Sequence, residues 1–453
     1  MSAPPSLRHA VAVIGGATAG AEVAARLADH GCAVSVFEQN PRPYGKIEDG
    51  LPRWHVGLRN KEYEAISAKL SKPGVHFVPL TKVGQDVGFA ELCREWGFSA
   101  VVLACGAWRD RQIPIDGAEA WVGKGLIYQN PFIIWFNHKH EADYSGETFE
   151  ALDGSLVVGG GLASIDVAKL LMLETTLAKL RERGIELDLI ELEVKGIPKI
   201  LARHDLKFED LGLEGCTIFY RRRPEDMPLV EIPDGADEKR ADKVRNARKR
   251  LLEKAMQKFR FRLEELSAPD ALLTEGDRVV GLRLRRTRME GGRPTPTDET
   301  YERRGSCVIS SIGSIPEPIP EIEMKGELFA FTDWDLGRLD GYPNVFSVGN
   351  VVTGKGNIVA SRKHAAEVVE AAIESYLGLG EDGHAAEAEL PNASADAAAE
   401  QAQRISDAIG KTEPASPEAV ARALEKTRAR QEAVGYDGNY ATWIARVSPK
   451  AQD

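Results

Sequence analysis

The sequence has little cysteine, and its cysteines form no cluster. The chain contains five, which are far apart and include no C-x-x-C pair: Cys32, Cys93, Cys105, Cys216 and Cys307. An odd number at this spacing excludes a disulfide framework and a dithiol redox motif, and it leaves no set of thiolates for an iron–sulfur centre. His138 and His140 have no further ligand cluster beside them, so we predict no metal site.

Long apolar runs and an excess of basic residues are also missing. The beginning, "MSAPPSLRHAVAVIGG", contains no apolar signal-peptide core, and no apolar run approaches the roughly 18 residues of a membrane helix. A net charge of −11 is not typical of a nucleic-acid-binding protein. We therefore expect a cytoplasmic protein with no membrane span and no nucleic-acid partner, whose 453 residues suffice for two or three domains.

The first of two glycine-rich turns lies in "AVAVIGGATAGAEVAARLADHGCAVSVFEQN". Its pattern predicts a βαβ unit with strands at 10–14 and 33–37 and a helix at 21–29. Gly15 and Gly20 take the first and third places of the dinucleotide fingerprint, and Ala17 replaces the middle glycine. Glu38 ends the second strand, 23 residues after Gly15, where an acid accepts hydrogen bonds from ribose hydroxyls. This unit therefore predicts a dinucleotide site.

The second turn lies in "SLVVGGGLASIDVAKLLML". We expect a strand at 156–158, a turn formed by Gly159, Gly160 and Gly161, and a helix at 165–173. Gly161 is the middle glycine, and Ser164 stands in the third, helix-packing place. The free N–H groups and positive dipole end of such a helix suit a pyrophosphate, which predicts a second nucleotide.

The stretch "GCTIFYRRRPEDMP" predicts which nucleotide the second site binds. The next strand of this unit is expected at 217–220, so Arg221 follows it in the place that Glu38 has in the first unit. An acid repels a 2′-phosphate, whereas arginine makes charge-assisted bonds to it, so we expect NADP. The distance to Gly161 far exceeds the roughly 20 residues of a minimal unit, which predicts a largely helical insertion at 174–214.

An acid-ended and an arginine-ended fingerprint in one chain resemble the flavoproteins that bind two dinucleotides, FAD in the first site and a nicotinamide cofactor in the second. Four more segments are similar to the adrenodoxin reductase and glutamate synthase small-subunit family: "NPRPYGKIEDGLP", "NPFIIWFNH", "RRRPEDMP" and "NVFSVGNVVTGKGNIVASRKHAAE". Together these motifs span residues 10–378. Departures from the family pattern are Tyr44 and Lys46 for Gly and Leu, and Asn350 for Asp.

The resemblance implies an α/β fold with two Rossmann-like domains, an NADP domain inserted in an FAD domain, and a helical C-terminal extension. The expected boundaries are 1–148 and 326–380 for FAD, 149–325 for NADP, and 381–453 for the linker and extension. Residues implied for FAD are Gly15, Ala19, Gly20, Glu38, Gly45, Lys46, Leu51, Ala104, Gly106, Gly349, Asn350, Gly356, Asn357 and Ile358. Those for NADP are Gly159, Gly161, Leu162, Ala163, Ser164, Arg221 and Arg222.

The activity implied is that of a ferredoxin–NADP reductase type enzyme. It transfers hydride between NADPH and FAD and passes single electrons to or from a ferredoxin-like or other iron–sulfur carrier. We assign no catalytic side chain, because hydride transfer depends mainly on ring positioning, with Gly356, Asn357 and Ile358 lining the flavin. Three alternatives stay open: an NADPH-oxidising flavin subunit of a glutamate synthase-like or electron-bifurcating complex, an inactive FAD-binding structural subunit, and a flavin monooxygenase.

Several other features have two interpretations. Cys105 is interpreted as a small buried apolar residue, Asn357 as a helix N-cap or a flavin residue, and Lys355 as a flavin neighbour or a solvated loop residue. The basic helix predicted at 237–262, with eleven Lys or Arg against four acids, is a solvated face or a dock for an acidic redox protein. Residues that would extend this dock are Arg42, Arg53, Arg59 and Lys61.

The last part of the chain predicts a helix and a docked end. After an Ala-rich acidic linker, Ser416 and Pro417 are typical of the N-cap and first position of a helix running to 434. Three aromatics follow, Tyr436, Tyr440 and Trp443, more than a free tail carries. We expect them to dock on the chain's own surface or on a partner.

Overall fold

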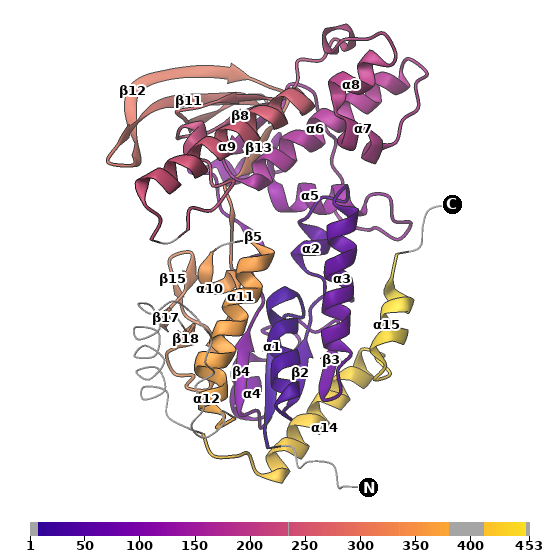
Figure 1. Cartoon of the computed structure of the whole chain (residues 1–453), viewed down its shortest axis with the longest axis vertical. Helices are drawn as coiled ribbons and strands as arrows, with labels where there is room; N and C mark the ends of the chain where they lie inside the picture. The colour runs from indigo at the N-terminus through magenta and orange to yellow at the C-terminus, as the bar shows by residue number, and fades with distance from the viewer. Residues whose placement is uncertain (1–7, 234, 335, 355, 380–411, 450–453) are drawn as a thin grey trace.

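The computed structural model describes residues 8–449 apart from 234, 335, 355 and 380–411. Lys355 and most of the Ala-rich linker therefore lie outside the described residues. Two five-stranded parallel sheets, one above the other along the long axis, form the two halves of the molecule (Figure 1). The predicted α/β fold with two Rossmann-like units and a helical C-terminal region is confirmed.

The first sheet has the strand order β19-β4-β1-β2-β3. Its strands are β1 (Ala10–Ile14), β2 (Ala33–Phe37), β3 (Val75–Val78), β4 (Ala100–Leu103) and β19 (Val345–Ser347). Because side chains alternate along a strand, β1 sends Val11 and Val13 to one face and Ala10, Ala12 and Ile14 to the other. Both faces are buried, as in parallel sheets generally, so the strands are apolar throughout.

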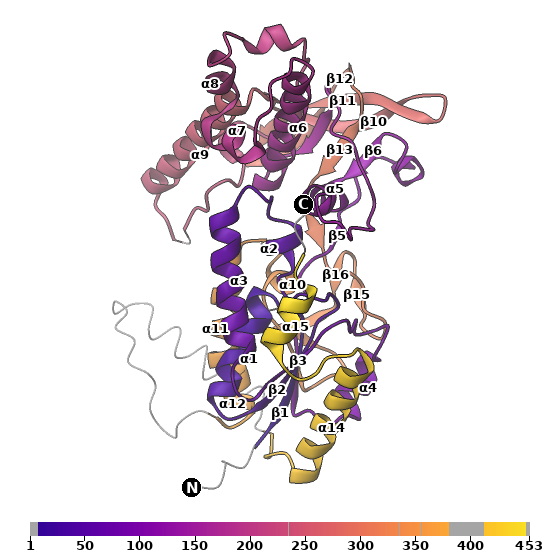
Figure 2. The same ribbon diagram turned by 90° about the vertical axis from the view of Figure 1, so that its right-hand side faces the viewer.

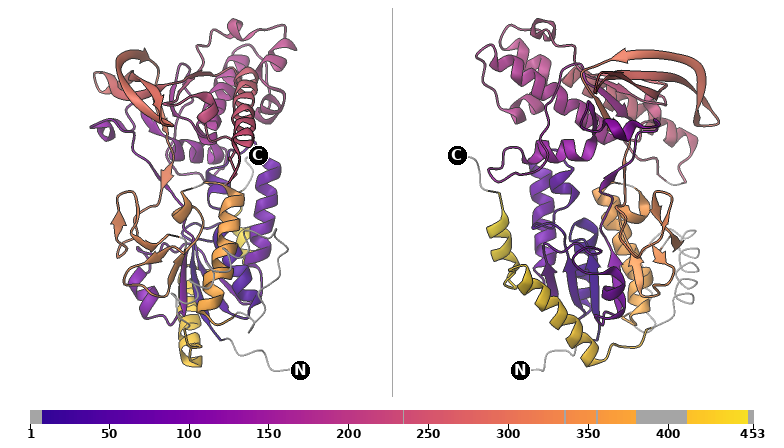
Figure 3. Two further views of the ribbon diagram at one scale, coloured as in Figure 1. Left: turned by 60° about the vertical axis from the view of Figure 1, so that its left-hand side comes forward. Right: turned by 180° about the vertical axis from the view of Figure 1, so that it is seen from behind.

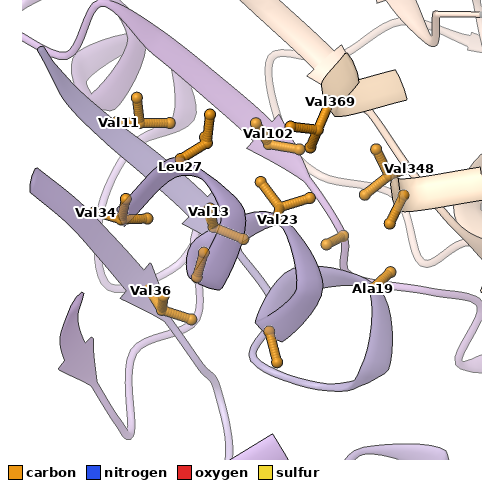
Figure 4. Packing of buried hydrophobic residues seen from close by; sticks show 14 of the residues in the cluster. Val11, Val13, Ala19, Val23, Leu27, Val34, Val36, Val102, Val348 and Val369 are labelled. Atoms are coloured by element: carbon orange, nitrogen blue, oxygen red, sulfur yellow. The ribbon is translucent and has the colours of Figure 1, made fainter. Parts of the chain in front are cut away.

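Helices cover both faces of this sheet. On the Val11 face lie α1 (Thr18–Asp29), α3 (Val56–Leu70) and α11 (Ile358–Val368), and Figure 4 shows Val23 and Leu27 of α1 packed on the strand valines. On the other face lie α4 (Phe89–Arg94) and α14 (Pro417–Ala433). Ser416 caps α14 by accepting a hydrogen bond from the Ala419 N–H, as its sequence predicts.

The second sheet has the order β6-β13-β7-β8-β9. Its strands are β6 (Leu126–Tyr128), β7 (Leu156–Gly159), β8 (Thr217–Phe219), β9 (Arg262–Glu264) and β13 (Val308–Ser311). One face packs on α5 (Gln129–His138), α6 (Leu162–Arg181) and the basic helix α9 (Glu238–Phe259). The other packs on an antiparallel sheet of β10 (Ser267–Glu275), β11 (Arg278–Glu290) and β12 (Arg293–Arg304).

The insertion between α6 and β8 is helical, as predicted. It contains α7 (Leu189–Lys195), which Asp188 caps, and α8 (Ile197–Ala202). Their apolar side chains Leu192, Ile197 and Ile200 are fully buried against the rest of the second half. The insertion therefore lengthens the unit without changing its sheet.

The chain passes between the halves on two short strands, β5 (Arg109–Asp110) and β14 (Ser314–Ile315), which pair antiparallel. The domain boundaries remain a prediction, and strand pairing favours moving both of them towards the N-terminus. β6 precedes residue 148 and yet pairs with β13 of the second sheet. Likewise, the return crossing at β14 precedes residue 325.

The C-terminal segment, residues 412–449, wraps around the β3 edge of the first sheet (Figures 1 and 2). After α14 it continues into α15 (Tyr440–Val447), and its three aromatic residues are buried. Phe77 of β3 meets the rings of Tyr436 and Tyr440 at centroid distances of 5.9 and 5.3 Å. The docking predicted for these aromatics therefore occurs on the chain's own surface. Among the described helices, none combines the length and the apolar character that a membrane crossing requires.

Candidate dinucleotide sites

A cavity of about 350 Å³ opens where the carboxyl ends of β1, β2 and β4 meet. Five residues that the sequence assigns to FAD line it: Gly15, Glu38, Gly45, Ala104 and Gly106. The other lining residues are Ile14, Ala17, Phe37, Gln39, Thr81–Gln85, Cys105, Trp108 and Glu317–Pro320. Ligands of open α/β sheets bind at this edge, so the position fits a nucleotide.

The first glycine turn has no room for side chains. Gly15 has φ +102°, and a Cβ there would lie 2.6 Å from the Ala104 carbonyl oxygen. A Cβ on Gly20 would lie 1.8 Å from the Gly15 carbonyl oxygen, so α1 packs directly on the turn. No side chain caps the N-terminus of α1, which leaves its first amides for a ligand.

Ala17, which replaces the middle glycine of the fingerprint, is accommodated by Gly45. Gly45 has φ +52°, and a Cβ on it would lie 2.9 Å from the Ala17 methyl group. The methyl group thus occupies space that a side chain at 45 would need. The departure from the fingerprint therefore leaves the turn and the cavity intact.

Glu38 is a buried carboxylate at the cavity wall. It is 5% exposed, and it accepts hydrogen bonds from the Gly16 N–H (2.9 Å) and the Asn40 N–H (3.0 Å). Desolvation raises the pKa of Glu38 to about 7, and the backbone hydrogen bonds oppose this shift. Ribose hydroxyls would supply further donors to a carboxylate that burial leaves short of solvent.

The segment that begins NVFSVGN at residue 344, which resembles a second FAD motif of the family, contacts the first glycine turn. A Cβ on Gly349 would lie 2.9 Å from the Cβ of Ala19, so these two segments touch. The Asn350 Oδ1 atom is buried and accepts no hydrogen bond within the described part of the chain. Such an orphaned acceptor next to the turn fits a ligand hydroxyl, for example one on the ribityl chain of FAD.

The N-terminus of α11 is capped by its own sequence. Asn357 accepts hydrogen bonds from the Val359 N–H (2.8 Å) and the Ala360 N–H (3.3 Å). These two amides are therefore already satisfied, which leaves fewer donors for a flavin than the sequence suggests. Gly356, Asn357 and Ile358 are absent from the described cavity lining, and their role at the flavin stays a prediction.

Lys46 connects the segment NPRPYGKIEDGLP, residues 40–52 and called the flavin segment below, to the crossing between the halves. Its Nζ donates to Asn130 Oδ1 of α5 (2.8 Å) and to Ser314 Oγ of β14 (3.0 Å). The ammonium group lies 5.6 Å from the ring centroid of Trp108, and desolvation lowers the pKa of Lys46 to about 8. Lys46 therefore points to the junction, where a leucine would make no hydrogen bond.

Asn137, from the tryptophan-containing α5 motif, fixes the same segment. Its Nδ2 donates to the carbonyl oxygens of Glu48 (2.9 Å) and Leu51 (3.1 Å), and its Oδ1 accepts from the Arg53 N–H (2.9 Å). Leu51 is partly exposed and lies outside the described cavity lining. The resemblance of α5 to its family motif thus has a structural cause, because the asparagine orders the flavin segment.

The second glycine turn differs in what covers it. A Cβ on Gly160 would lie 2.1 Å from the ring of Tyr220, whereas a Cβ on Gly161 would meet no atom within 4 Å. Gly161 is the N-cap of α6 and makes no side-chain cap, and Ser164 is buried with its Oγ donating to the Gly161 carbonyl oxygen (2.7 Å). The open backbone at Gly161, followed by Leu162 and Ala163, is suited to a close-lying pyrophosphate.

Strand register corrects the position assigned to Arg221. The Glu38 N–H donates to Val78 O of the next strand, and the Tyr220 N–H donates to Glu264 O in the same way. The carbonyl oxygens of these two residues accept from the N–H groups of Thr81 and Ser267. Tyr220 is therefore the equivalent of Glu38, and the prediction that Arg221 holds that place is wrong by one residue.

The three consecutive arginines separate into two kinds. Arg221 and Arg222 make no side-chain hydrogen bond or ion pair with the described residues. Arg223, in contrast, pairs with Glu225 at 3.3 Å and with Asp226 at 3.2 Å. Two guanidinium groups are thus free for an anionic ligand beside the second turn, and the third is neutralised.

Other candidate residues have structural partners. Cys105 is partly exposed at the cavity wall rather than buried, and desolvation raises the pKa of its thiol to about 12, so it stays protonated. His138 lies between Asp49 (2.9 Å) and Glu141 (2.8 Å), and the described residues hold no group of three or more side chains suited to a metal ion. The two dock residues nearest the flavin segment are also engaged: Arg42 pairs with Glu48, and Arg53 lies over Phe136.

The sequence reasoning missed two walls of the cavity. Thr81–Gln85 follow β3, and Glu317–Pro320 follow β14, and a Cβ on Gly84 would lie 2.8 Å from Pro320. The first wall was accessible in principle, because the residues after every strand of a parallel sheet gather at its carboxyl edge. The second comes from far along the chain and carries no local signal.

Comparisons with known proteins agree with the motifs. No protein-family model matches the chain. It is similar to "NADPH:adrenodoxin oxidoreductase, mitochondrial" of Arabidopsis thaliana, with 23% identity over 415 residues that cover 82% of each chain. It is 33% identical to "Glutamate synthase [NADPH] small chain" of Mycobacterium tuberculosis over 133 residues, 29% of this chain and 26% of that one.

A solved structure, "Mycobacterium tuberculosis FprA in complex with NADPH", aligns with a TM-score of 0.62 and 20% identity over 94% of this chain and 90% of that chain. At this identity the likeness concerns the fold. The curated relatives come from the adrenodoxin reductase and glutamate synthase small-subunit family, so the resemblance stated from the motifs is confirmed.

Proposed function

We propose that the chain is an FAD-dependent oxidoreductase that moves electrons between NADPH and an iron–sulfur carrier of ferredoxin type. One observation carries the proposal: two glycine-turn units of the same backbone end in Glu38 and in Tyr220 followed by two free arginines. The first ending accepts hydrogen bonds from ribose hydroxyls, and the second attracts a 2′-phosphate. A protein with one site of each kind fits FAD and NADP.

The residues of the first site fit FAD. Glu38 would accept from the adenosine ribose, the uncapped N-terminus of α1 would receive the pyrophosphate, and the Asn350 acceptor would take a ribityl hydroxyl. The flavin ring, when bound, accepts a hydride and releases electrons singly. This chain's residues would hold the cofactor, keep water from it, and set the orientation of the two halves through Lys46.

In the second site, the Gly161 turn would receive the pyrophosphate of NADPH, and Arg221 and Arg222 would bind the 2′-phosphate. The relatives support this assignment through their names, since the Arabidopsis protein is called an NADPH:adrenodoxin oxidoreductase and the FprA structure contains NADPH. No side chain is needed as acid or base, because the reaction depends on placing two rings at contact distance.

The test is anaerobic reduction of the purified, FAD-loaded protein with NADPH and NADH in parallel, followed by addition of a ferredoxin. NADPH is expected to bleach the flavin absorbance faster than NADH, and oxidised ferredoxin is expected to restore it. A yellow protein that NADPH does not bleach would instead support the inactive structural subunit. Hydroxylation of a small molecule at the expense of NADPH, without ferredoxin, would support a monooxygenase.

For the carrier, the outer face of α9 is our proposed dock. Six of its cations are exposed and make no ion pair with the described residues: Lys239, Arg240, Lys243, Lys249, Arg250 and Lys254. Complementary charge accelerates encounter with an acidic protein and is weakened by salt. Reversing Arg240, Lys243 and Arg250 to Glu should raise the KM for an acidic ferredoxin and leave the KM for NADPH unchanged.

A second candidate is a flavin subunit of a larger complex. The likeness to a glutamate synthase small chain favours it, and the segment Glu225–Pro228 after the arginines resembles the sequence of that branch. Purification of the native protein from its source would decide between the candidates. A cluster-bearing second chain that elutes with it would favour the subunit, and ferredoxin reduction by the single chain would favour the reductase.

A further inference from the structure

The C-terminal segment contacts two loops that contribute residues to the first cavity, the one after β2 and the one after β3. α14 runs across one face of the first sheet, and α15 then passes along the β3 edge (Figures 2 and 3). Gln431 Nε2 donates to the Phe77 carbonyl oxygen of the edge strand at 2.7 Å. The segment thus satisfies part of an otherwise unpaired sheet edge and reaches the loops at its carboxyl end.

Arg430 of α14 joins the two ends of the turn at 80–86. Its Nε donates to Thr81 Oγ1 (2.9 Å), and its Nη2 donates to the Leu80 carbonyl oxygen (3.1 Å). The same Nη2 lies 3.4 Å from Asp86 Oδ1. One planar guanidinium group therefore binds the start and the end of this turn, which a single ammonium group could not do.

This turn is held in a conformation that needs support. Leu80 has φ +50°, in the left-handed region that non-glycine residues rarely adopt. Asp86 also accepts from the Lys82 N–H (2.8 Å), so both carboxylate oxygens are used within the turn and its clamp. Without Arg430, the Leu80 carbonyl oxygen and one carboxylate oxygen of Asp86 would each lose a partner, while the contacts of Leu80 with Asn40 and of Asp86 with Lys82 would remain.

The turn is one wall of the cavity beside the ribose-binding acid. Thr81–Gln85 line the cavity, and the Thr81 N–H donates to the Glu38 carbonyl oxygen at 2.8 Å. This wall and Gln39 line the same cavity as Glu38, so they are the nearest candidates to contact the adenosine of a dinucleotide held there.

The end of the C-terminal segment, at α15, makes hydrogen bonds to the loop that follows β2. Trp443 Nε1 donates to the Pro41 carbonyl oxygen (2.7 Å), and Arg42 Nη1 donates to the Val447 carbonyl oxygen (2.9 Å). This loop begins at Gln39, which also lines the cavity. The two contacts of the segment, at 80–86 and at 41–42, thus reach both of the loops that contribute residues to the cavity.

We propose that Arg430 is a positioning residue for the adenosine half of FAD, and that the C-terminal segment forms the outer support of that half of the site. The inference rests on the proposed function, because it takes FAD as the ligand of the first cavity. Arg430 does not line the cavity, so it acts through Leu80, Thr81 and Asp86. The flavin half of the site receives no contact from this side chain.

The experiment compares Arg430→Ala with Arg428→Ala in the full chain, after removal of flavin. Arg428 is on the same helix, exposed, and makes no hydrogen bond or ion pair with the described residues. Affinities of the apo-protein for FAD and for FMN are measured by quenching of flavin fluorescence. Arg430→Ala is expected to weaken FAD binding about tenfold, in line with the loss of a charge-assisted contact, and to leave FMN binding unchanged, because FMN lacks adenosine. Arg428→Ala should bind FAD as the unaltered protein does.

The outcomes separate three cases. If the unaltered apo-protein does not bind FAD, the proposed function fails. If it binds FAD and Arg430→Ala binds FAD equally well, this inference is overturned; equal weakening of FAD and FMN overturns it too, because that result indicates general loosening. Should Arg430→Ala not fold, Asp86→Asn removes the ion pair from the other side, and an unchanged FAD affinity in that variant contradicts the proposal.

Discussion

The two glycine-turn units have the same backbone and opposite endings. In each, the residue that follows the second strand donates its N–H to the third strand, and its carbonyl oxygen accepts from a residue beyond that strand, so Glu38 and Tyr220 are structural equivalents. Glu38 is buried and holds two amides, whereas Tyr220 covers Gly160 and is followed by two unpaired arginines. The backbone thus defines where a dinucleotide lies, and the side chains at and after one position determine which dinucleotide it is.

The largest expected effect comes from removing Arg221 and Arg222, which distinguish the second unit from the first. Arg221→Ala with Arg222→Ala is expected to raise the KM for NADPH about a hundredfold, because each charge-assisted hydrogen bond contributes roughly 1.5–3 kcal/mol. The KM for NADH should stay nearly the same. Steady-state kinetics with both nucleotides measures the difference, and an equal loss for the two would contradict the assignment. Arg223→Ala, whose guanidinium is already paired, is the matched control with little expected effect.

Substitutions at Gly160 and Gly161 test two different properties of the second turn, its packing and its binding of a pyrophosphate. Gly161→Ala places a methyl group in open space, so it should leave the melting temperature unchanged and weaken NADPH binding about tenfold or more by obstructing the pyrophosphate. Gly160→Ala would displace the Tyr220 ring and is expected to cost about 1–3 kcal/mol of stability. Thermal unfolding and NADPH titration of both variants separate the two effects. An unchanged NADPH affinity in Gly161→Ala would show that the pyrophosphate does not bind at this turn.

The equivalent change in the first unit is Glu38→Gln, which keeps the shape and removes the charge. FAD affinity should fall about tenfold, since a neutral acceptor replaces a charged one at the ribose. Fluorescence titration of the apo-protein with FAD measures this. Unchanged affinity would show that the acid does not contact the ligand.

The same variant also tests the raised pKa of Glu38, through the pH dependence of apo-protein stability. The pKa of Glu38 is raised from 4.5 to about 7 by burial, so between these values the native state binds more protons than the unfolded state, and stability falls as pH rises. Glu38→Gln does not titrate, although its amide NH2 faces one of the two backbone N–H groups and loses that hydrogen bond at every pH. The melting temperature of the unaltered apo-protein should therefore fall between pH 5 and pH 8, whereas that of the variant should stay level over this range; parallel curves would contradict the raised pKa.

The smallest expected effect concerns Cys105 in the cavity wall. Desolvation keeps it a thiol, so Cys105→Thr should change FAD affinity and NADPH oxidation less than about twofold, as for substitutions that keep volume and neutrality. Alkylation of the unaltered protein with iodoacetamide at pH 8, followed by mass spectrometry, should leave this residue unmodified. Rapid modification would indicate a reactive cysteine.

Local pattern was sufficient for the elements that build both units. β1 and β2 have the predicted bounds, because a parallel strand buried on both faces is an uninterrupted apolar run between turn residues. The capped helix at Ser416 was equally readable, since its cap and its first-position proline are local. For the same reason five of the residues predicted for FAD lie together at the cavity.

Features that depend on contacts between residues far apart in the sequence could not be predicted from the sequence. Tyr220 is apolar enough to count as strand, so only the hydrogen bonds to β9 show that it is the terminal position and Arg221 the next. The direction of Lys46 depends on Ser314 and Asn130, which lie far away in sequence. The aromatic residues after α14 predicted docking, but the sequence did not indicate their target, the β3 edge, which is seen only in the folded chain.

The wrapping of residues 412–449 around the first sheet has a consequence for biosynthesis. Translation proceeds at roughly 5–20 residues per second, and domains generally fold as they emerge. The first sheet begins with β1 near residue 10 but is completed by β19 at 345–347, and the last elements to cover it are α14 and α15. The second half can therefore fold while the first is still open, and FAD should be acquired after the C-terminal segment has left the ribosome.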